Sequence, residues 1–502
     1  MEKLKLPQDY TERSRTKIVA TLGPASSETE AILDLVRAGA DVFRLNMAHG
    51  TPDSQQLLLD RIREIEREMD QPIAVLVDLA GPKFRLGELE GDAIDCPEGG
   101  EYWFVTGEPQ AANELTTSYE PLVRELSVGD SVMLADGTVS MEVVERLADR
   151  VRMRVVQPGL IRSRQGINLP GVKLSAPAIS VEDHQHAIWA AKAGVDFVSL
   201  SFVRSPDEVR TLKDIVRSSG SQARVIAKIE KREALERLEE IVKEADGVMV
   251  ARGDLGVEID VAQMPLEQKR IIRVCDAQHK PVIIATQMLD SMQESMRPTR
   301  AEVTDVANAV LDGADACMLS GESAIGKHPA KAVAMMNRIA LATEASMHGN
   351  PLREKAEWLS DGLQDVTRAV VRGAGTMAHV LGAKLVVVAS YSGRTALALS
   401  QQRSFVPTVG VSSEPETLRQ MCLYWGVTPL ANAPACEVEQ LIKHTDAWAS
   451  RVGLAERGDR IVIVGGSHLT AGPDGDAMAE GVHDIVIVHE VEGLDAADVP
   501  AC

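Results

Sequence analysis

Residues 195–250 read VDFVSLSFVRSPDEVRTLKDIVRSSGSQARVIAKIEKREALERLEEIVKEADGVMV, and this stretch decides the fold. Short apolar runs rich in β-branched residues begin it, divide it and end it. Charged stretches with helical periodicity, 206–218 and 231–243, separate the runs. Short apolar runs of this kind are typical of strands that are buried on both faces, as in parallel sheets. The stretch therefore predicts strands that alternate with helices.

The same alternation extends in both directions along the chain. Eight apolar runs are expected to be strands: 17–22, 41–45, 73–78, 195–200, 224–229, 246–250, 282–285 and 315–319. Eight strand–helix units in order predict an α/β fold of the (β/α)8 TIM-barrel type. A doubly wound parallel sheet is the alternative, because a pattern of strands does not by itself fix the topology.

The alternation is interrupted once, after the third strand. Residues 82–176 contain short hairpin-like pieces such as 131–145 and predict a small inserted β-barrel domain. An insert at this position would cover the active face of a barrel and act as a lid. The barrel is therefore expected to comprise 1–81 and 177–348. Strand-like runs alternate with helical segments again near the C-terminus, which predicts an α/β domain over 349–502.

The composition excludes several classes of protein. The 502 residues include 53 Lys and Arg against 74 Asp and Glu, a net charge of −21, which argues against binding to nucleic acid or to a membrane surface. We see no apolar run of membrane-spanning length and no secretory signal. The six cysteines lack metal-ligand or redox spacing. These features predict a cytoplasmic protein.

Residues that follow the barrel strands share one mouth in a TIM barrel. They include Arg44, Asn46, His49, Asp78, Lys83, Arg85, Ser201, Arg204, Lys228, Glu230, Arg252, Gly253, Asp254, Thr286, Ser320 and Glu322. Lys228 and Glu230 are two apart on a strand end and face the same side. Two carboxylates, Glu230 and Asp254, without a Cys/His cluster suit Mg²⁺, and nearby cations complete a phosphoryl-transfer site.

Each of these residues alone is more often a solvated rim residue, but their repetition at successive strand ends favours a site. Three other motifs are rejected. Residues 321–327 resemble a nucleotide P-loop, but His328 stands where a hydroxyl ligand is needed. The Arg-Gly-Asp tripeptide at 252–254 resembles an adhesion motif, but it lies at a predicted strand end of a protein expected to be cytoplasmic. His184 and His186 are two residues apart in a predicted helix, so they do not face each other as the ligands of a metal site would. We interpret them as part of a solvated helix start.

Eight segments carry a resemblance to a known family: 16–27 (TKIVATLGPASS), 44–50 (RLNMAHG), 78–85 (DLAGPKFR), 166–171 (GINLPG), 228–230 (KIE), 249–258 (MVARGDLGVE), 285–292 (ATQMLDSM) and 297–322. Through them the sequence resembles pyruvate kinases over essentially its whole length. The resemblance implies a barrel, a lid domain after the third strand and a C-terminal effector domain. It also implies Mg²⁺-dependent phosphoryl transfer from phosphoenolpyruvate to ADP in glycolysis, giving pyruvate and ATP.

The resemblance also implies roles for single residues. Lys228 would stabilise the transferring phosphoryl group and the enolate, and Thr286 would order the route by which the enolate is protonated. Glu230 and Asp254 would hold Mg²⁺. The expected substrate-binding residues are Arg44, Asn46, Asp78, Ala251, Gly253, Asp254 and Thr286, with Arg44 and Thr286 also counted as catalytic. The expected nucleotide-binding residues are Arg85, His49 and Asn46, and Asp136 matches an acid of the lid domain.

The chain departs from the common family pattern at two places. Many members need K⁺, but Ala48 and Leu79 replace oxygen-bearing residues here, and Lys83 brings an ammonium group close to the K⁺ position. Two cations there would repel each other in a dry site. We therefore predict a K⁺-independent enzyme in which Lys83 is catalytic in place of K⁺; the alternative is that Lys83 points to solvent. Gln165 stands where the family usually has a Lys that assists the nucleotide phosphates.

The C-terminal domain contains SYSGRT at 390–395, between a predicted strand and a helix. Ser390, Ser392, Gly393, Arg394 and Thr395 are expected to bind the phosphate of a sugar-phosphate or nucleotide effector, in an allosteric enzyme that the resemblance implies is a homotetramer. The alternative is an ordinary strand-to-helix turn. Two other functions stay open at this point: a metal-dependent lyase or aldolase acting on enolates, and a phosphometabolite-binding regulator without catalysis.

Overall fold

The computed structural model describes residues 12–82, 84–135, 137–347, 365–435, 437–466 and 484–492. Within them a closed barrel is formed by β1 (Lys17–Thr21), β2 (Val42–Asn46), β3 (Ala74–Asp78), β12 (Phe197–Leu200), β13 (Arg224–Ile229), β14 (Gly247–Ala251), β15 (Val282–Ala285) and β16 (Ala316–Leu319). All neighbouring strands are parallel, and β1 pairs with β16 to close the ring. The predicted TIM barrel is confirmed, and the open doubly wound sheet is excluded.

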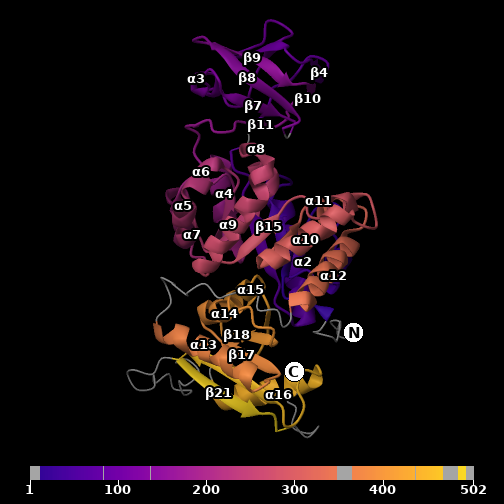
Figure 1. Cartoon of the computed structure of the whole chain (residues 1–502), viewed down its shortest axis with the longest axis vertical. Helices are drawn as coiled ribbons and strands as arrows, with labels where there is room; N and C mark the ends of the chain where they lie inside the picture. Colours follow the sequence, from indigo (N-terminus) through magenta and orange to yellow (C-terminus); the bar gives the residue numbers. More distant parts are fainter. Residues whose placement is uncertain are drawn as a thin grey trace.

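Helices surround the barrel in the middle of the molecule (Figure 1). They include α1 (Thr29–Ala38), α2 (Pro52–Met69), α4 (Val181–Ala193), α5 (Pro206–Ser218), α9 (Met264–Ala277), α10 (Arg300–Asp312) and α12 (Pro329–Met347). The stretch 231–243, expected to be one helical segment, is two helices, α6 (Arg232–Glu236) and α7 (Leu238–Glu244). Arg237 between them leaves helical geometry with φ −116° and ψ 27°. No Gly or Pro marks this break.

The prediction of a solvated start for α4 is wrong for one of its two histidines. His184 is exposed, but His186 is buried. His186 lies on the same helical stripe as the buried residues Asp183, Ala187 and Ala190, which face the barrel. The helical period therefore decides the burial of His186 more strongly than its polarity does.

Four aspartates form a regular pattern at the N-terminal end of the barrel, and we call them the floor aspartates. Asp41, Asp196, Asp246 and Asp315 each stand directly before an alternate strand. Each accepts a hydrogen bond from a backbone N–H of the preceding barrel strand, at Ile18, Val75, Val225 and Val282, over 2.8–2.9 Å. Each also pairs with a cation, respectively Lys17, Arg63, Lys213 and Arg403. Each aspartate thereby joins the strand that follows it to the preceding barrel strand, so the strands are linked in pairs.

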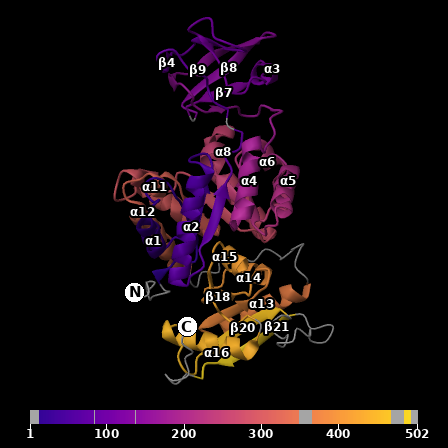
Figure 2. The same ribbon diagram turned by 180° about the vertical axis from the view of Figure 1, so that it is seen from behind.

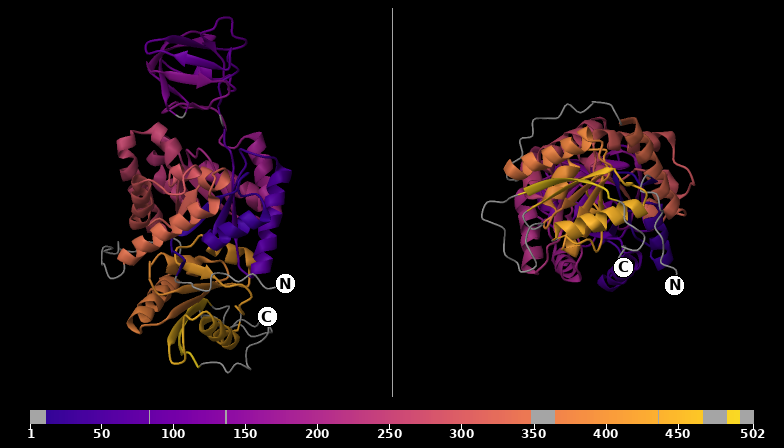
Figure 3. Two further views of the ribbon diagram at one scale, coloured as in Figure 1. Left: turned by 90° about the vertical axis from the view of Figure 1, so that its right-hand side faces the viewer. Right: turned by 90° about the horizontal axis from the view of Figure 1, so that it is seen from below.

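The chain leaves the barrel after β3, as predicted, and builds a separate β-rich body. One sheet has the order β11-β7-β8-β9-β5-β6, and a second pairs β10 with β4. The strands are β4 (Ala93–Cys96), β5 (Glu101–Val105), β6 (Glu114–Leu115), β7 (Ser131–Leu134), β8 (Val139–Arg146), β9 (Arg150–Gln157), β10 (Gly159–Arg162) and β11 (Ile167–Asn168), with the short helix α3 (Leu122–Glu125). This insert stands beyond one end of the barrel on two connecting segments (Figure 3).

The residues from 365 onward form a C-terminal unit at the opposite end of the barrel (Figure 2). Its sheet has the order β19-β18-β17-β20-β21, with β21 antiparallel to β20. The strands are β17 (Leu385–Ala389), β18 (Thr408–Val411), β19 (Val427–Pro429), β20 (Arg460–Gly466) and β21 (Asp484–Glu490). The helices are α13 (Asp365–Val380), α14 (Arg394–Ser400), α15 (Pro415–Met421) and α16 (Val438–Arg451). The bounds expected for the three domains stay predictions, since 348–364 lie outside the described residues.

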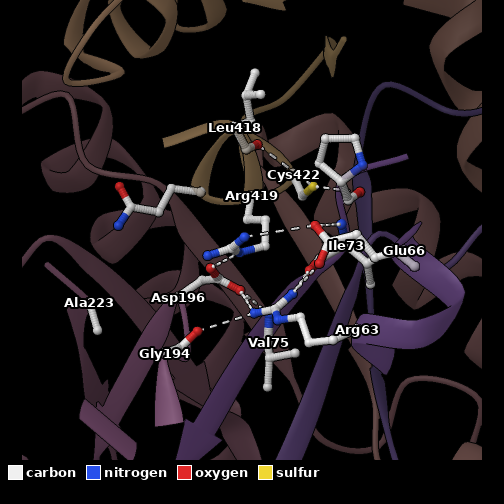
Figure 4. A network of polar contacts seen from close by, with 12 residues as sticks. Arg63, Glu66, Ile73, Val75, Gly194, Asp196, Ala223, Leu418, Arg419 and Cys422 are labelled. Carbon is white, nitrogen blue, oxygen red and sulfur yellow. Dashed lines mark hydrogen bonds and ion pairs between the residues drawn. The ribbon is translucent and has the colours of Figure 1, made fainter. Parts of the chain in front are cut away.

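Polar contacts fasten the C-terminal unit to the barrel floor (Figure 4). Arg419 on α15 donates to Asp196 Oδ1 at 2.6 Å, while Arg63 on α2 holds the other oxygen at 2.8 Å. Cys422 Sγ donates to the carbonyl of Pro72 at 3.3 Å. Among the cysteines that the structure describes, Cys96, Cys275, Cys317 and Cys422 are buried and unpaired. No helix in the described ranges is long and apolar enough to cross a bilayer.

Candidate active site

Lys228 and Glu230 end β13 at the barrel mouth and point to the same side, as predicted. Lys228 Nζ lies 2.9 Å from Glu230 Oε1 and 3.5 Å from Asp78 Oδ1, and it donates to Ser201 Oγ at 2.8 Å. Burial alone would lower the pKa of Lys228, but the carboxylates of Asp78 and Glu230 outweigh burial and raise it. Lys228 therefore presents a buried, permanently charged ammonium group.

Asp78, at the end of β3, organises the cations of the mouth. Its Oδ2 accepts two hydrogen bonds from Arg44, at 2.8 Å from Nε and 2.5 Å from Nη2, and its Oδ1 accepts one from Ser199 Oγ at 2.6 Å. Burial disfavours the charged carboxylate, but Lys228 and Arg44 more than offset it and lower the pKa of Asp78 to about 2. Asp78 is thus ionised and fully engaged.

Glu230 and Asp254 line a cavity that Glu233 and Glu258 also border, and Glu258 is paired with Lys231. Glu230 is 1% exposed, and its Oε2 accepts the N–H of Phe202 at 2.6 Å. Its Oε1 contacts Lys228 only as an ion pair and has no hydrogen-bond partner. Burial and the nearby Asp254 raise the pKa of Glu230 although Lys228 opposes them. A buried carboxylate beside a second carboxylate at the edge of a cavity fits a Mg²⁺ ion whose remaining ligands are water or substrate. No cluster of three or more metal-ligating side chains occurs in the described part of the chain.

The cavity has a volume of about 260 Å³ and lies between the barrel mouth and the start of the insert. Glu230, Asp254, Phe202 and Arg204 line it from the barrel. Arg85 and residues 166–169, from the segments that connect to the insert, line it from the other side. The cavity therefore brings both metal-site carboxylates and one of the expected nucleotide-binding residues, Arg85, to one space.

Gly253 and Thr286 follow β14 and β15, the two strands that come next to β13 in the barrel. Gly253 N–H donates to Thr286 Oγ1 at 2.8 Å, and that hydroxyl donates to the carbonyl of Ala285 at 2.6 Å. Thr286 has φ +67°, which is strained for a β-branched residue. Arg252 holds this conformation, because its Nη2 donates to the Thr286 carbonyl at 2.7 Å and its Nη1 to Asp305 at 2.7 Å. The sequence predicts Arg252 at the mouth, but it contains no signal that Arg252 holds the backbone of Thr286.

The other residues expected to bind the nucleotide do not line the cavity. Asn46 uses its Oδ1 to accept the N–H of Ala48 at 3.1 Å. His49 is exposed and does not line the cavity. Gln165 turns its Oε1 onto the N–H of Arg162 at 2.7 Å, so its side chain serves a local turn. Lys83 and Asp136 lie outside the described residues.

Two further predicted positions have mainly structural contacts. Glu322, in the segment that resembles a P-loop, accepts backbone N–H groups from Leu289 and Ser320 and so holds two loops together. Arg204 donates to the carbonyls of Leu174 and Ala176, which fixes the returning connection of the insert. Ser320 contributes its backbone N–H to the hydrogen bond with Glu322.

The segment 390–395 follows β17 and opens α14, as predicted. Ser390 is buried, whereas Ser392 and Arg394 are exposed, and Arg394 Nε lies 3.3 Å from Ser392 Oγ. Gly393 has φ +75°, a conformation that favours glycine. The carbonyl of Ser392 accepts from Arg224 Nη2 at 2.7 Å, so this loop contacts the first residue of β13.

Comparisons with known proteins find matches over most of the chain. Residues 13–333 match the family model of the pyruvate kinase barrel domain, and 368–476 match that of the pyruvate kinase alpha/beta domain. A pyruvate kinase of Staphylococcus aureus (strain MRSA252) is 38% identical over 459 residues, which cover 90% of this chain and 77% of the relative. The crystal structure of a pyruvate kinase from Cryptosporidium parvum superposes with a TM-score of 0.88 at 32% identity, covering 98% of this chain and 99% of that one.

Proposed function

The chain belongs to the pyruvate kinase family of phosphotransferases, and on that premise we propose a Mg²⁺-dependent, K⁺-independent transfer of the phosphoryl group of phosphoenolpyruvate to ADP. One observation carries the proposal. Lys228 and Arg44 converge on Asp78 at the barrel mouth, and Lys228 also pairs with Glu230, which lines a cavity below the insert together with Asp254. Phosphoryl transfer needs positioned countercharge more than covalent help, and this site supplies it.

Each reacting group has a place in this proposal. Arg44 and Lys228 bind the phosphoryl oxygens, and Lys228 also stabilises the negative charge that develops on the enol oxygen as the P–O bond breaks. Glu230 and Asp254 would hold Mg²⁺, which supplies further countercharge to the phosphoryl oxygens. Arg85 faces the cavity where the nucleotide phosphates would enter.

Thr286 serves the second half of the reaction, in which the enolate is protonated at carbon. Its hydroxyl is held by the N–H of Gly253 and by the carbonyl of Ala285, so its lone pair and proton have fixed directions. A fixed hydroxyl next to Gly253, Asp254 and Ala251 can orient the substrate and the water that carries the proton. The proposed substrate-binding set also includes Arg44 and Asn46 of β2 and Asp78 of β3.

The K⁺-independence rests on how Asp78 is engaged. Arg44 and Ser199 occupy its two oxygens, and Lys228 adds a second cation at 3.5 Å. Ala48 and Leu79 provide no side-chain oxygen nearby. A monovalent cation would have few ligands here and would meet like charge. Lys83 as the built-in cation stays a proposal from the sequence.

Pyruvate formation from phosphoenolpyruvate and ADP with Mg²⁺, in potassium-free salts and then with KCl, tests the proposal. Equal turnover in both conditions is expected. Turnover that appears only with KCl would refute the K⁺-independence but keep the kinase. Omission of Mg²⁺ with a chelator is expected to abolish turnover. A phosphate-bearing effector at Ser390–Thr395, a homotetramer and a cytoplasmic location are proposed from the family resemblance; light scattering tests the tetramer.

A further inference from the structure

Two residues that follow β12, Ser201 and Phe202, contact both reactive side chains of β13. Ser201 Oγ accepts from Lys228 Nζ and donates to the carbonyl of Leu79 at 2.7 Å. The N–H of Phe202 donates to Glu230 Oε2 at 2.6 Å. A backbone N–H bonded to a carboxylate is a charge-assisted hydrogen bond, which is stronger and shorter than a neutral one. This turn therefore sets the orientation of Lys228 and of Glu230.

Phe202 makes its bond from a strained backbone. Its φ is +54°, in the left-handed region, where a bulky aromatic residue is a genuine outlier. Strain of this kind persists where the surroundings determine it, and it concentrates at functional sites. The N–H of this strained residue is the one that donates to Glu230.

Three contacts hold Phe202 in this conformation. Glu230 accepts its N–H, and Lys231 Nζ lies 5.9 Å from the centre of its ring. The ring also packs so closely on Gly81 that a Cβ at position 81 would lie 2.8 Å from Phe202 Cδ2. Gly81 belongs to the segment that leaves the barrel for the insert. Phe202 thus lies between the proposed metal carboxylate and that connection.

We propose that Phe202 is a positioning residue for the metal carboxylate. Its left-handed conformation aims the N–H at Glu230 Oε2 and thereby fixes the orientation of the carboxylate, whose Oε1 lies 2.9 Å from Lys228 Nζ, at the edge of the cavity where a metal ion would bind. Groups that orient metal ligands typically change metal affinity by about 10–100-fold when they are lost. The proposal rests on the proposed function, because it assumes that Glu230 holds the divalent ion.

The test compares Phe202→Val with Phe202→Asn in binding of Mn²⁺ alone, followed by electron paramagnetic resonance without substrates. Both variants lose the ring and have side chains of similar size. Asn adopts the left-handed conformation readily, whereas β-branched Val adopts it only under strain. The expected result is near-native Mn²⁺ affinity for Phe202→Asn and a loss of about 10-fold or more for Phe202→Val. The Mg²⁺ concentration for half-maximal activity is expected to rise in the same variant.

The outcomes separate this proposal from the metal site itself. Equal weakening in both variants would assign the effect to the ring, and no weakening in either would leave Phe202 without a role; both results overturn the proposal. Glu230→Gln, measured in the same way, is expected to lose Mn²⁺ binding. Native binding by Glu230→Gln would instead refute the metal site. Circular dichroism checks folding, and if Phe202→Val does not fold, Phe202→Ala replaces it, with an expected loss that lies between those of Asn and Val.

Discussion

At the floor of the barrel, each of the four aspartates accepts a hydrogen bond from a backbone N–H and pairs with a cation, whereas at the mouth Glu230 and Asp254 line a cavity. The mouth also contains the strained residues Thr286 and Phe202. The polar groups of the floor tie neighbouring strands together. The mouth combines strained residues with carboxylates at a cavity, where metal and substrate could meet them.

The two ends are expected to differ in what charge removal does to the reaction. A substitution at the mouth removes countercharge that the transition state uses, so kcat falls in the folded protein in addition to any loss of stability. A substitution at the floor strands a buried partner, and the reaction is affected only through the stability of the frame.

The largest effect is expected at Lys228. Lys228→Met removes the ammonium group that faces the transferring phosphoryl group, and kcat is expected to fall by about 10³–10⁵-fold, as for other single cations in phosphoryl transfer. Steady-state kinetics at saturating substrates measures this loss. Urea unfolding of the same variant is expected to show a loss of stability as well, because the buried carboxylates of Glu230 and Asp78 lose a partner, so kcat is measured below the unfolding transition. A kcat within tenfold of the native value would contradict the proposed role.

At the floor the clearest variant is Asp196→Ala. It leaves Arg63 and Arg419 without their shared carboxylate and Val75 N–H without an acceptor. The free energy of unfolding is expected to fall by about 3–5 kcal/mol, with kcat little changed below the unfolding transition. Urea titration measures the loss. The matched control is Asp34→Ala, which removes an exposed ion pair with Arg37 and is expected to cost under about 1 kcal/mol. Equal losses of unfolding free energy in the two variants would show that Asp196 stabilises the barrel no more than an exposed ion pair does.

Thr286 offers a way to separate strain from chemistry at the mouth. Thr286→Val keeps the β-branch at φ +67° but loses the hydroxyl, and kcat is expected to fall by about 100-fold. Thr286→Ser keeps the hydroxyl, relieves the branch and is expected to stay within about tenfold of the native kcat. Solvent exchange into the methyl group of pyruvate reports the protonation step directly. Similar kcat values for the two variants would show that the hydroxyl does not act.

The smallest effect is the pH dependence that Asp78 contributes. Its pKa is lowered from 3.8 to about 2 in the folded state, so its stabilising contribution is complete above the unfolded value and is lost as pH falls toward 2. Between pH 5 and pH 3 the stability difference between the native chain and Asp78→Asn is expected to shrink by about 1 kcal/mol. Urea unfolding at both pH values measures it. A difference that grows on acidification would refute the lowered pKa.

Much of the barrel and of its mouth could be predicted from the sequence. All eight apolar runs became barrel strands, because strands buried on both faces leave a continuous apolar signal. Lys228 and Glu230 lie together because a strand has a two-residue repeat, and Asp78 and Arg44 because strand ends meet at one mouth. The family match supports the kinase over the lyase and over the regulator without catalysis.

Other features depend on backbone conformation and could not be predicted in this way. The left-handed φ of Phe202 and the hold of Arg252 on Thr286 arise from neighbouring loops, and single residue types do not encode them. The floor aspartates had a visible signal in GAD at 39–41 and 313–315 and in GVD at 194–196. That pattern recurs at unequal spacing, and an Asp between a helix and a strand reads as an ordinary loop residue.

The floor pattern has a consequence for the insert. The chain enters the insert from β3 and returns to the barrel before β12, and Asp196 ties these two strands together at their far ends through Val75. The pair of strands that carries both connections to the insert is therefore held at its far end by Asp196 with Arg63 and Arg419, at the other end of the barrel from the reacting groups. The connections to the insert and the contacts of the C-terminal unit thus share one pair of barrel strands.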